Sequence, residues 1–165
     1  MTHAHSAQAV VTAAASAETL FDYLDDPARL GSHMQESSTM MLGGTMSYEF
    51  DEARGRAVGS LIRMEGSVLG LKLSVEQVIV ERHPPHRKTW ETRGQPDLLV
   101  IGAYRMGFEI NASGQSSRLR VFIDYDTPNS VIGKIVGAIF GPIYARWCVN
   151  RMAKDAVGMF SREPS

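Results

Sequence analysis

Large aromatic and sulfur-containing side chains fall on one face of the β-strands that the sequence predicts. They are Tyr48, Trp90, Tyr104, Met106, Phe108 and Tyr125. Residues two apart on a strand point to the same side of a sheet, so this set is expected to face inward. It forms either ordinary core or the lining of a cavity, in which the tyrosine hydroxyls and the Trp90 N–H would contact a ligand. Because fully buried hydroxyls each need a partner, three inward tyrosines favour the cavity.

Arg63 and Glu65 are the charged residues whose spacing could support acid–base chemistry. They share one face of a strand, but both faces of that strand carry apolar residues, so its orientation stays open. The pair is either a proton-transferring pair inside a cavity or an ion pair on the solvent side. Tyr104 is the third candidate for a catalytic group.

Motifs for other chemistries are absent from the sequence. It contains no Gly-x-Ser-x-Gly nucleophile motif, Walker loop or Gly-x-Gly-x-x-Gly loop. His83 and His86 flank two prolines with no third ligand nearby, so neither a metal nor a cofactor is expected. Cys148 is the single cysteine, which excludes an internal disulfide and fits a reducing, cytoplasmic location. Beside Trp147 on an apolar helix, it is expected to be a small buried hydrophobe.

Composition limits the remaining function classes. The 165 residues include 17 Lys and Arg against 18 Asp and Glu, a net charge of −1. This balance argues against nucleic-acid binding through bulk positive charge and against a polybasic membrane anchor. The length fits one domain over residues 1–165, with mobile tails expected at 1–6 and 161–165. Residues 1–9 contain no Lys or Arg, so they do not form a targeting signal.

The order of elements follows from hydrophobic periodicity and from Gly and Pro punctuation. A weak first strand covers 7–13, Ser16 caps a first helix that ends at Pro27, and a second short helix runs through Leu30. Six antiparallel strands are then expected at 46–51, 58–65, 71–79, 88–93, 100–111 and 118–125. The predicted fold is therefore α+β, with about seven strands curved around one long C-terminal helix.

That last helix begins at Asn129 or Ser130 and runs to about Phe160, with Pro142 expected to kink or break it. Apolar residues recur on it at intervals of three and four, and four of them are expected to line the cavity. These four are Val136, Ile139, Phe140 and Ile143. Lys134 and Arg146 leave 11 uncharged residues between them, short of the roughly 20 that a membrane span needs, so stable insertion is not expected.

Gly133, Gly137 and Gly141 share one face of this helix. Each costs about 1 kcal/mol relative to alanine, so a compensating interaction is expected. The glycines allow close packing against the sheet or a partner, or leave room at a cavity mouth, or form a dimerisation face of the membrane type. A homodimer is therefore possible.

The same order of elements resembles the START, pollen-allergen and polyketide-cyclase superfamily, which has the helix-grip fold. The segments that carry the likeness are ASAETLFDYL at 15–24, DPARL at 26–30, LGLKLSVEQV at 69–78, the prolines 84–85 with KTW at 88–90, DYDTP at 124–128 and YARWC at 144–148. The resemblance covers nearly the whole chain. It implies a hydrophobic cavity between the sheet and the long helix.

Two functions are compatible with that resemblance. The first is binding or transport of a hydrophobic, lipid- or polyketide-like small molecule. The alternative is a polyketide cyclase or dehydratase that acts on a substrate in the same cavity, although no residue matches a transferable catalytic motif. A third branch, of lipid chaperones and ribosome-associated toxins, fits less well because the near-neutral charge disfavours contact with RNA.

Overall fold

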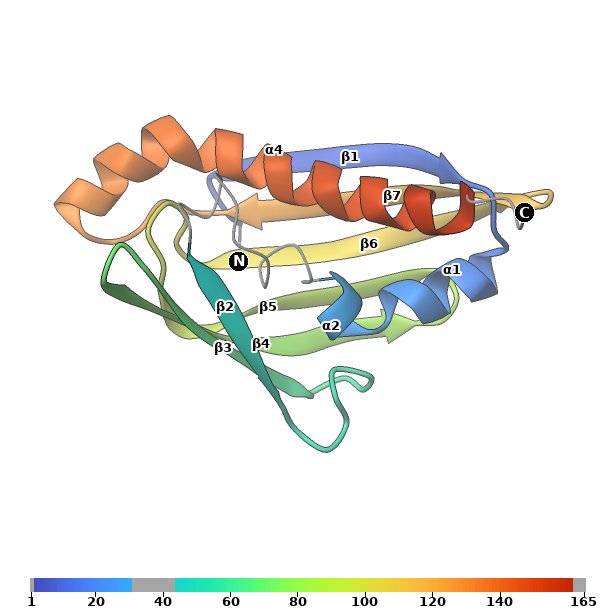
Figure 1. The fold of residues 1–165 in the computed structure, drawn as a ribbon, viewed down its shortest axis with the longest axis horizontal. Helices are drawn as coiled ribbons and strands as arrows, with labels where there is room; N and C mark the ends of the chain where they lie inside the picture. Colours follow the sequence, from blue (N-terminus) through green and yellow to red (C-terminus); the bar gives the residue numbers. More distant parts are fainter. Residues whose placement is uncertain (1, 31–43, 162–165) are drawn as a thin grey trace.

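The computed structural model describes residues 2–30 and 44–161. The elements, in chain order, are β1 (His5–Ala13), α1 (Ala17–Leu24), α2 (Pro27–Leu30), β2 (Thr45–Phe50), β3 (Leu61–Val68), β4 (Leu71–His83), β5 (Arg87–Asp97), β6 (Tyr104–Ser113), β7 (Ser116–Tyr125) and α4 (Val131–Ser161). Figure 1 shows α4 lying along the same face of the sheet as α1 and α2.

All seven strands belong to one antiparallel sheet with the order β1-β7-β6-β5-β4-β3-β2. The first strand therefore pairs with the last, and the other strands follow as a meander. Figure 1 shows β2 and β3 turning away from the plane of β6 and β7, so the sheet is curved. The predicted helix-grip arrangement, with two short helices after the first strand, is confirmed.

Capping residues set where the helices begin. The Ser16 side chain accepts a hydrogen bond from the Thr19 backbone N–H, as predicted for the start of α1. Ser130 does the same for Gly133 at the start of α4, at 2.9 Å. Pro142 lies inside α4 without interrupting it, so the predicted break does not occur.

Several predicted boundaries are wrong for identifiable reasons. The strand expected from Val58 begins at Leu61, because Asp51 holds the preceding turn by accepting hydrogen bonds from Ser60 Oγ and the Leu61 N–H. The strand expected from Val100 begins at Tyr104, because the Gly102 N–H bonds instead to the Asp126 carbonyl in a connecting loop.

The expected tails also begin elsewhere. β1 starts at His5, and His3 Nδ1 lies 2.8 Å from an Asp126 carboxylate oxygen, so part of segment 1–6 is held by the sheet. At the other end α4 includes Ser161, and 162–165 lie outside the described residues.

The glycines of α4 allow close packing against the connection between β7 and α4. A Cβ atom added to Gly137 would lie 2.8 Å from Pro128 Cδ and 3.0 Å from the Val100 carbonyl oxygen. On Gly133 it would lie 2.7 Å from Pro128 Cβ. These distances are shorter than ordinary van der Waals contact, so this face of the helix tolerates no side chain. Close packing is the role that the structure assigns to the glycine face.

We therefore predict that Gly137→Ala destabilises the protein by about 1–2 kcal/mol despite alanine's better helix propensity, because rigid ring and backbone atoms must move. Gly158 lies on the same helix, and a Cβ atom added there would meet no atom within 4 Å. Gly158→Ala is therefore the matched control and should stabilise by about 0.5–1 kcal/mol. Urea denaturation of both variants measures the difference. Equal changes in the free energy of unfolding would contradict close packing.

Candidate functional site

A cavity of about 90 Å³ lies between the concave face of the sheet and the second half of α4. Six lining residues carry polar groups: Tyr48, Gln77, Lys88, Tyr104, Tyr144 and Cys148. The others are mainly apolar, with the indole N–H of Trp90 as a further donor: Pro27, Leu30, Met46, Ile62, Met64, Leu73, Ile79, Trp90, Leu98, Ile101, Met106, Ile123 and Met152. The lining, all from described residues, includes no Asp, Glu or His.

Four of the six predicted inward residues, Tyr48, Trp90, Tyr104 and Met106, line this cavity. Phe108 and Tyr125 are buried but lie outside the lining. The Phe108 ring instead packs edge-on against Trp90 and Phe21, at centroid distances of 6.4 and 5.6 Å. Tyr125 lies under the helix, where its Cε2 would be 3.3 Å from a Cβ atom added to Gly141. Phe108 therefore supports the cavity wall from behind Trp90, whereas Tyr125 packs against the helix at Gly141.

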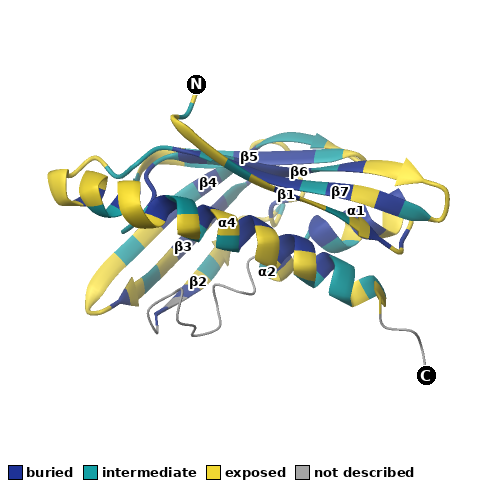
Figure 2. Cartoon of the chain, turned by 90° about the horizontal axis from the view of Figure 1, so that it is seen from above, coloured by how far each residue is buried: buried dark blue, intermediate teal, exposed yellow. Residues whose placement is uncertain are grey.

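The predicted helix residues lie on the wrong side of α4 for the cavity. Ile139, Phe140 and Ile143 are each more than half exposed, and Val136 is partly exposed. Figure 2 shows long exposed stretches in the first half of α4, where the helix extends along the edge of the fold. The helix instead contributes Tyr144, Cys148 and Met152 to the lining. The large apolar residues do not lie on the buried face of α4, because the helix backbone lies so close to its neighbours there that only small residues fit.

Arg63 and Glu65 lie on the outer, solvent side of β3 and do not form a pair in the cavity. The Arg63 guanidinium donates to Glu76 at 2.9 Å and lies 3.6 Å from Glu49, across β2, β3 and β4. The open question of which face of this strand lines the cavity is thereby answered, since Ile62 and Met64 point inward.

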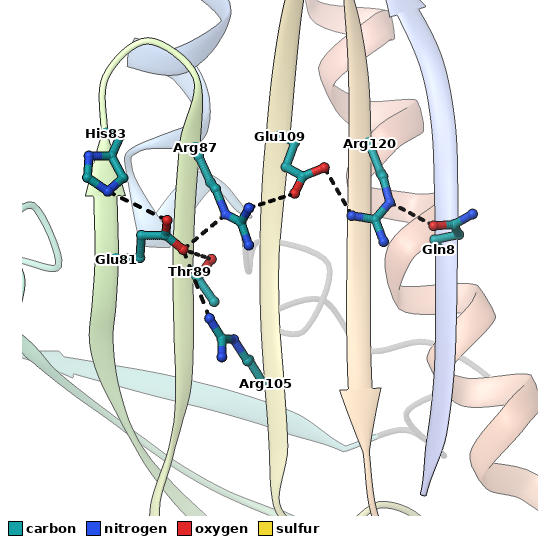
Figure 3. Close-up of polar contacts among 8 residues, drawn as sticks. All are labelled: Gln8, Glu81, His83, Arg87, Thr89, Arg105, Glu109 and Arg120. Atoms are coloured by element: carbon teal, nitrogen blue, oxygen red, sulfur yellow. Dashed lines mark hydrogen bonds and ion pairs between the residues drawn. The ribbon is translucent and has the colours of Figure 1, made fainter. Parts of the chain in front are cut away.

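Ion pairs cover the rest of the outer face of the sheet. Figure 3 shows a chain of contacts in which Glu81, Arg87, Glu109 and Arg120 alternate in charge across β4, β5, β6 and β7. Arg120 extends the chain to Gln8 on β1, at 2.7 Å. The two faces of the sheet therefore differ in kind: one is ionic and solvated, and the other is apolar with a few neutral polar groups.

The neutral polar groups in the cavity gather around Tyr104. Gln77 Nε2 donates a hydrogen bond to the Tyr104 oxygen. Burial raises the pKa of the Tyr48, Tyr104 and Tyr144 hydroxyls above the ordinary value of 10. Burial also raises the pKa of the Cys148 thiol to about 12, so at neutral pH it is a protonated thiol and not a nucleophilic thiolate. The cavity therefore offers hydrogen-bond donors but no charged base among these four residues.

Lys88 is the cationic residue of the lining, and its charge is matched by Asp25. Lys88 is 1% exposed, and its Nζ donates to the Asp25 carboxylate at 2.8 Å and to the Asp25 carbonyl at 2.9 Å. Arg82 donates to both carboxylate oxygens of Asp25, at 3.2 and 2.8 Å. Burial lowers the pKa of Lys88, whereas the hydrogen bonds to Asp25 raise it. The Lys88 side chain therefore lines the cavity while its ammonium group is held by Asp25.

A β-bulge brings these charges together. Ile79 pairs with Trp90, and Glu81 pairs with Thr89. Between these two pairs β4 advances by two residues while β5 advances by one, so β4 contains one extra residue. The extra residue reverses the alternation of side chains. Glu81 consequently joins the outer face, and Arg82 turns inward beside Lys88.

Gln77, Lys88 and Tyr144 are site residues that the sequence interpretation did not identify. The signal for two of them was present: Gln77 lies between the inward Val75 and Ile79 at a spacing of two, and Lys88 precedes the inward Trp90 by two. Tyr144 and Cys148 follow Gly137 and Gly141 at helical spacing, so the glycine face, if taken as the buried one, would have located them.

Comparison with known proteins informs the fold more than the activity. No protein-family model matches the chain, and no curated protein matches it. Among solved structures, protein CV1439 from Chromobacterium violaceum is 15% identical, with a TM-score of 0.64 over 96% of this chain and 98% of its own. Norcoclaurine synthase from Thalictrum flavum is 16% identical, with a TM-score of 0.62 over 96% of this chain and 87% of its own.

A third structure is the di-domain ARO/CYC protein BexL from the BE-7585A biosynthetic pathway. It is 17% identical, with a TM-score of 0.64, and the match covers 97% of this chain but 51% of BexL. At these identities the likeness shows the fold. The fold expected from the resemblance to the START, pollen-allergen and polyketide-cyclase superfamily is thereby confirmed.

Removal of the Asp25 carboxylate should destabilise the protein strongly. Asp25→Ala leaves the ammonium of Lys88 buried without a counter-ion, which costs about 3–5 kcal/mol. Asp155→Ala is the control, because it breaks an i,i+4 pair with Arg151 near the surface and should cost about 0.5 kcal/mol or less. Chemical denaturation measures both. A loss for Asp25→Ala as small as that of the control would show that Lys88 finds another partner or loses its proton.

The same cluster predicts an acid-sensitive contribution to stability. Burial raises the pKa of Asp25, but hydrogen bonds from Arg82 and Lys88 outweigh that effect and hold it below 3.8. A carboxyl with a lowered folded pKa stabilises the protein above the unfolded value, and this stabilisation is lost as pH falls through the folded pKa. Between about pH 5 and pH 2 the unfolding free energy of the native protein should therefore fall more steeply than that of Asp25→Asn. Parallel slopes would contradict the assignment.

Proposed function

We propose that the protein binds an apolar small molecule that carries a hydrogen-bond acceptor, with its acceptor atom at Tyr104. The observation that carries the proposal is the contact between Gln77 and Tyr104. Because the amide already donates to the phenol oxygen, the phenol hydrogen is directed to another acceptor. A ketone, quinone or ester oxygen in the cavity would provide one.

The character of the lining supports an apolar ligand. Outside the six polar residues and the indole N–H of Trp90 the lining side chains are apolar, and burial of apolar surface contributes about 25 cal/mol per Å². The cavity of about 90 Å³ is smaller than the roughly 300–1,000 Å³ of typical small-molecule pockets. Tyr48, Leu73 and Leu98 are partly exposed lining residues. A larger ligand would extend past them or displace flexible methionines such as Met46.

Binding without turnover is favoured over the cyclase or dehydratase alternative. Proton transfer at neutral pH works best with a group that titrates near that pH. The lining supplies no carboxylate or imidazole among the described residues, and the pKa of each lining tyrosine is raised away from neutrality. Burial lowers the pKa of Lys88 toward neutrality, but its ammonium group is directed to the Asp25 carboxylate and carbonyl and not into the cavity. Tyr104 is therefore proposed as an orienting donor. A cytoplasmic carrier of a lipid- or polyketide-like molecule is the role that we propose.

The first test compares two small probes with the same heavy-atom skeleton, acetophenone and α-methylstyrene, in which a CH2 group replaces the ketone oxygen. The native protein should prefer the ketone, and Tyr104→Phe should reduce this preference by about 3- to 10-fold, the effect of one net hydrogen bond. Tyr125→Phe is the control, since it removes a buried tyrosine hydroxyl outside the lining. Titration by ligand-observed NMR gives the ratio of affinities. A ratio unchanged in Tyr104→Phe would contradict the role of Tyr104, and failure of both probes to bind would contradict the cavity.

Native mass spectrometry of the protein as purified from cells supplies the natural ligand class. A discrete co-purifying apolar mass that carries an oxygen acceptor would agree with the proposal. Turnover of a poly-β-ketone that is lost in Tyr104→Phe while its affinity is retained would replace binding with the enzymatic alternative.

A further inference from the structure

The outward side of the first half of α4 is apolar. Its residues Val131, Ile132, Ile135, Ile139, Phe140 and Ile143 form the outer stripe, and each is more than half exposed in the described structure. They lie opposite the glycine face, so the packing of the helix on the sheet leaves the stripe uncovered by the described residues. An exposed apolar patch of this kind often marks an interaction surface.

A second apolar feature lies at the same end of the molecule. The two-residue turn between β3 and β4 presents Leu69, which is 76% exposed, next to Leu71, which is 54% exposed. Figures 1 and 2 both place this turn at the end of the fold where α4 begins. Leu69 has a φ of 49°, and turns of this type favour Asn or Gly at that position. An exposed leucine in a strained conformation, where a polar residue is expected, indicates selection for apolar contact.

The charge of α4 indicates what kind of partner fits the stripe. Beyond Ile143 the exposed residues of the helix turn basic, with Arg146, Arg151 and Lys154. With Lys134 and Asp155 the helix has a net charge of +3, whereas the whole chain has −1. A helix surface that is apolar in one half and cationic in the other matches a bilayer, whose interior is apolar and whose headgroups are anionic.

A second copy of the chain fits the stripe less well. Packing two stripes together would bring the net charge of +3 on one helix close to the same charge on the other, and like charges repel across an interface. Insertion across a bilayer is also disfavoured. By length and composition alone, α4 could cross a bilayer. However, its glycine face is packed on the protein. In addition, the charged Lys134 lies within the segment that carries the stripe, and Arg146 lies just beyond it.

We propose that the outer stripe and the β3–β4 turn dock the protein peripherally on an anionic lipid bilayer. Two lining residues, Leu73 and Leu98, connect this end of the molecule to the cavity. Leu73 follows Leu71 on the same side of β4. Leu98 precedes Val100, whose carbonyl oxygen lies against the glycine face of α4. The docked face therefore borders the cavity. The docking itself rests on exposure and charge, and it does not depend on which molecule the cavity binds.

The test is co-sedimentation of the full chain with vesicles of phosphatidylcholine mixed with phosphatidylglycerol, and with vesicles of phosphatidylcholine alone. The protein should bind the anionic vesicles more tightly and lose binding as salt is raised. Combined Ile135→Glu and Ile139→Glu should weaken binding to the anionic vesicles by at least about tenfold. Combined Arg146→Gln and Lys154→Gln should weaken it by about 10- to 30-fold, since each cation near the surface contributes about fivefold.

Val58→Glu is the matched control, because Val58 is 63% exposed but lies in the β2–β3 connection away from α4. It should bind vesicles like the native protein. The proposal would be overturned if the native protein bound neither kind of vesicle, or if the double-glutamate variant bound the anionic vesicles as tightly as the native protein does. Sedimentation velocity without lipid is the second measurement: a dimer that the glutamates dissociate would assign the stripe to a second copy and also overturn it. Acetophenone binding should persist in the glutamate variants, which separates this proposal from the one for the cavity.

Discussion

The buried carboxylate of Asp25 joins the helical layer to the sheet by charge. It follows the last residue of α1 and receives hydrogen bonds from Lys88 and Arg82 on neighbouring strands. Because an unmatched buried ammonium is costly, the two elements cannot separate without exposing or neutralising Lys88. The contact in turn requires the bulge in β4, which directs Arg82 inward to meet the end of α1. Apolar packing alone would allow α1 to slide along the sheet, whereas the ion pair fixes its end.

The separation of charge between the two faces of the sheet determines what chemistry the cavity can support. The outer face carries the ion-pair chain of Glu81, Arg87, Glu109 and Arg120, which solvent and salt screen. The inner face retains an amide, phenols and one thiol, all neutral at physiological pH. Lys88, the charged residue among the described lining residues, is already matched by Asp25. A site of this kind recognises shape and a hydrogen-bond acceptor more readily than it transfers protons.

Much of this architecture could be predicted from the sequence, because strands leave a strong signal. Alternation placed Tyr48, Trp90, Tyr104 and Met106 correctly at the cavity, since side chains on a paired strand have little freedom of direction. The bulge at Ile79–Glu81 was not predictable, because a reversal of alternation leaves no distinct mark in one sequence. The buried face of α4 was misjudged because hydrophobicity was taken to mean burial. On the buried face of α4, the short distance between the helix backbone and its neighbours decides which residues fit, and it favours glycine over isoleucine.

The two halves of α4 therefore contribute to the molecule in different ways. The first half contributes backbone and small residues to the fold, and its large side chains face away from the lining. The second half supplies Tyr144, Cys148 and Met152 to the cavity. Substitutions at exposed residues of the helix can change what its surface meets without altering the cavity, whereas substitutions at Tyr144, Cys148 and Met152 change the cavity lining. One continuous helix thus carries two sets of residues that can vary independently, since one set faces the surroundings and the other lines the cavity.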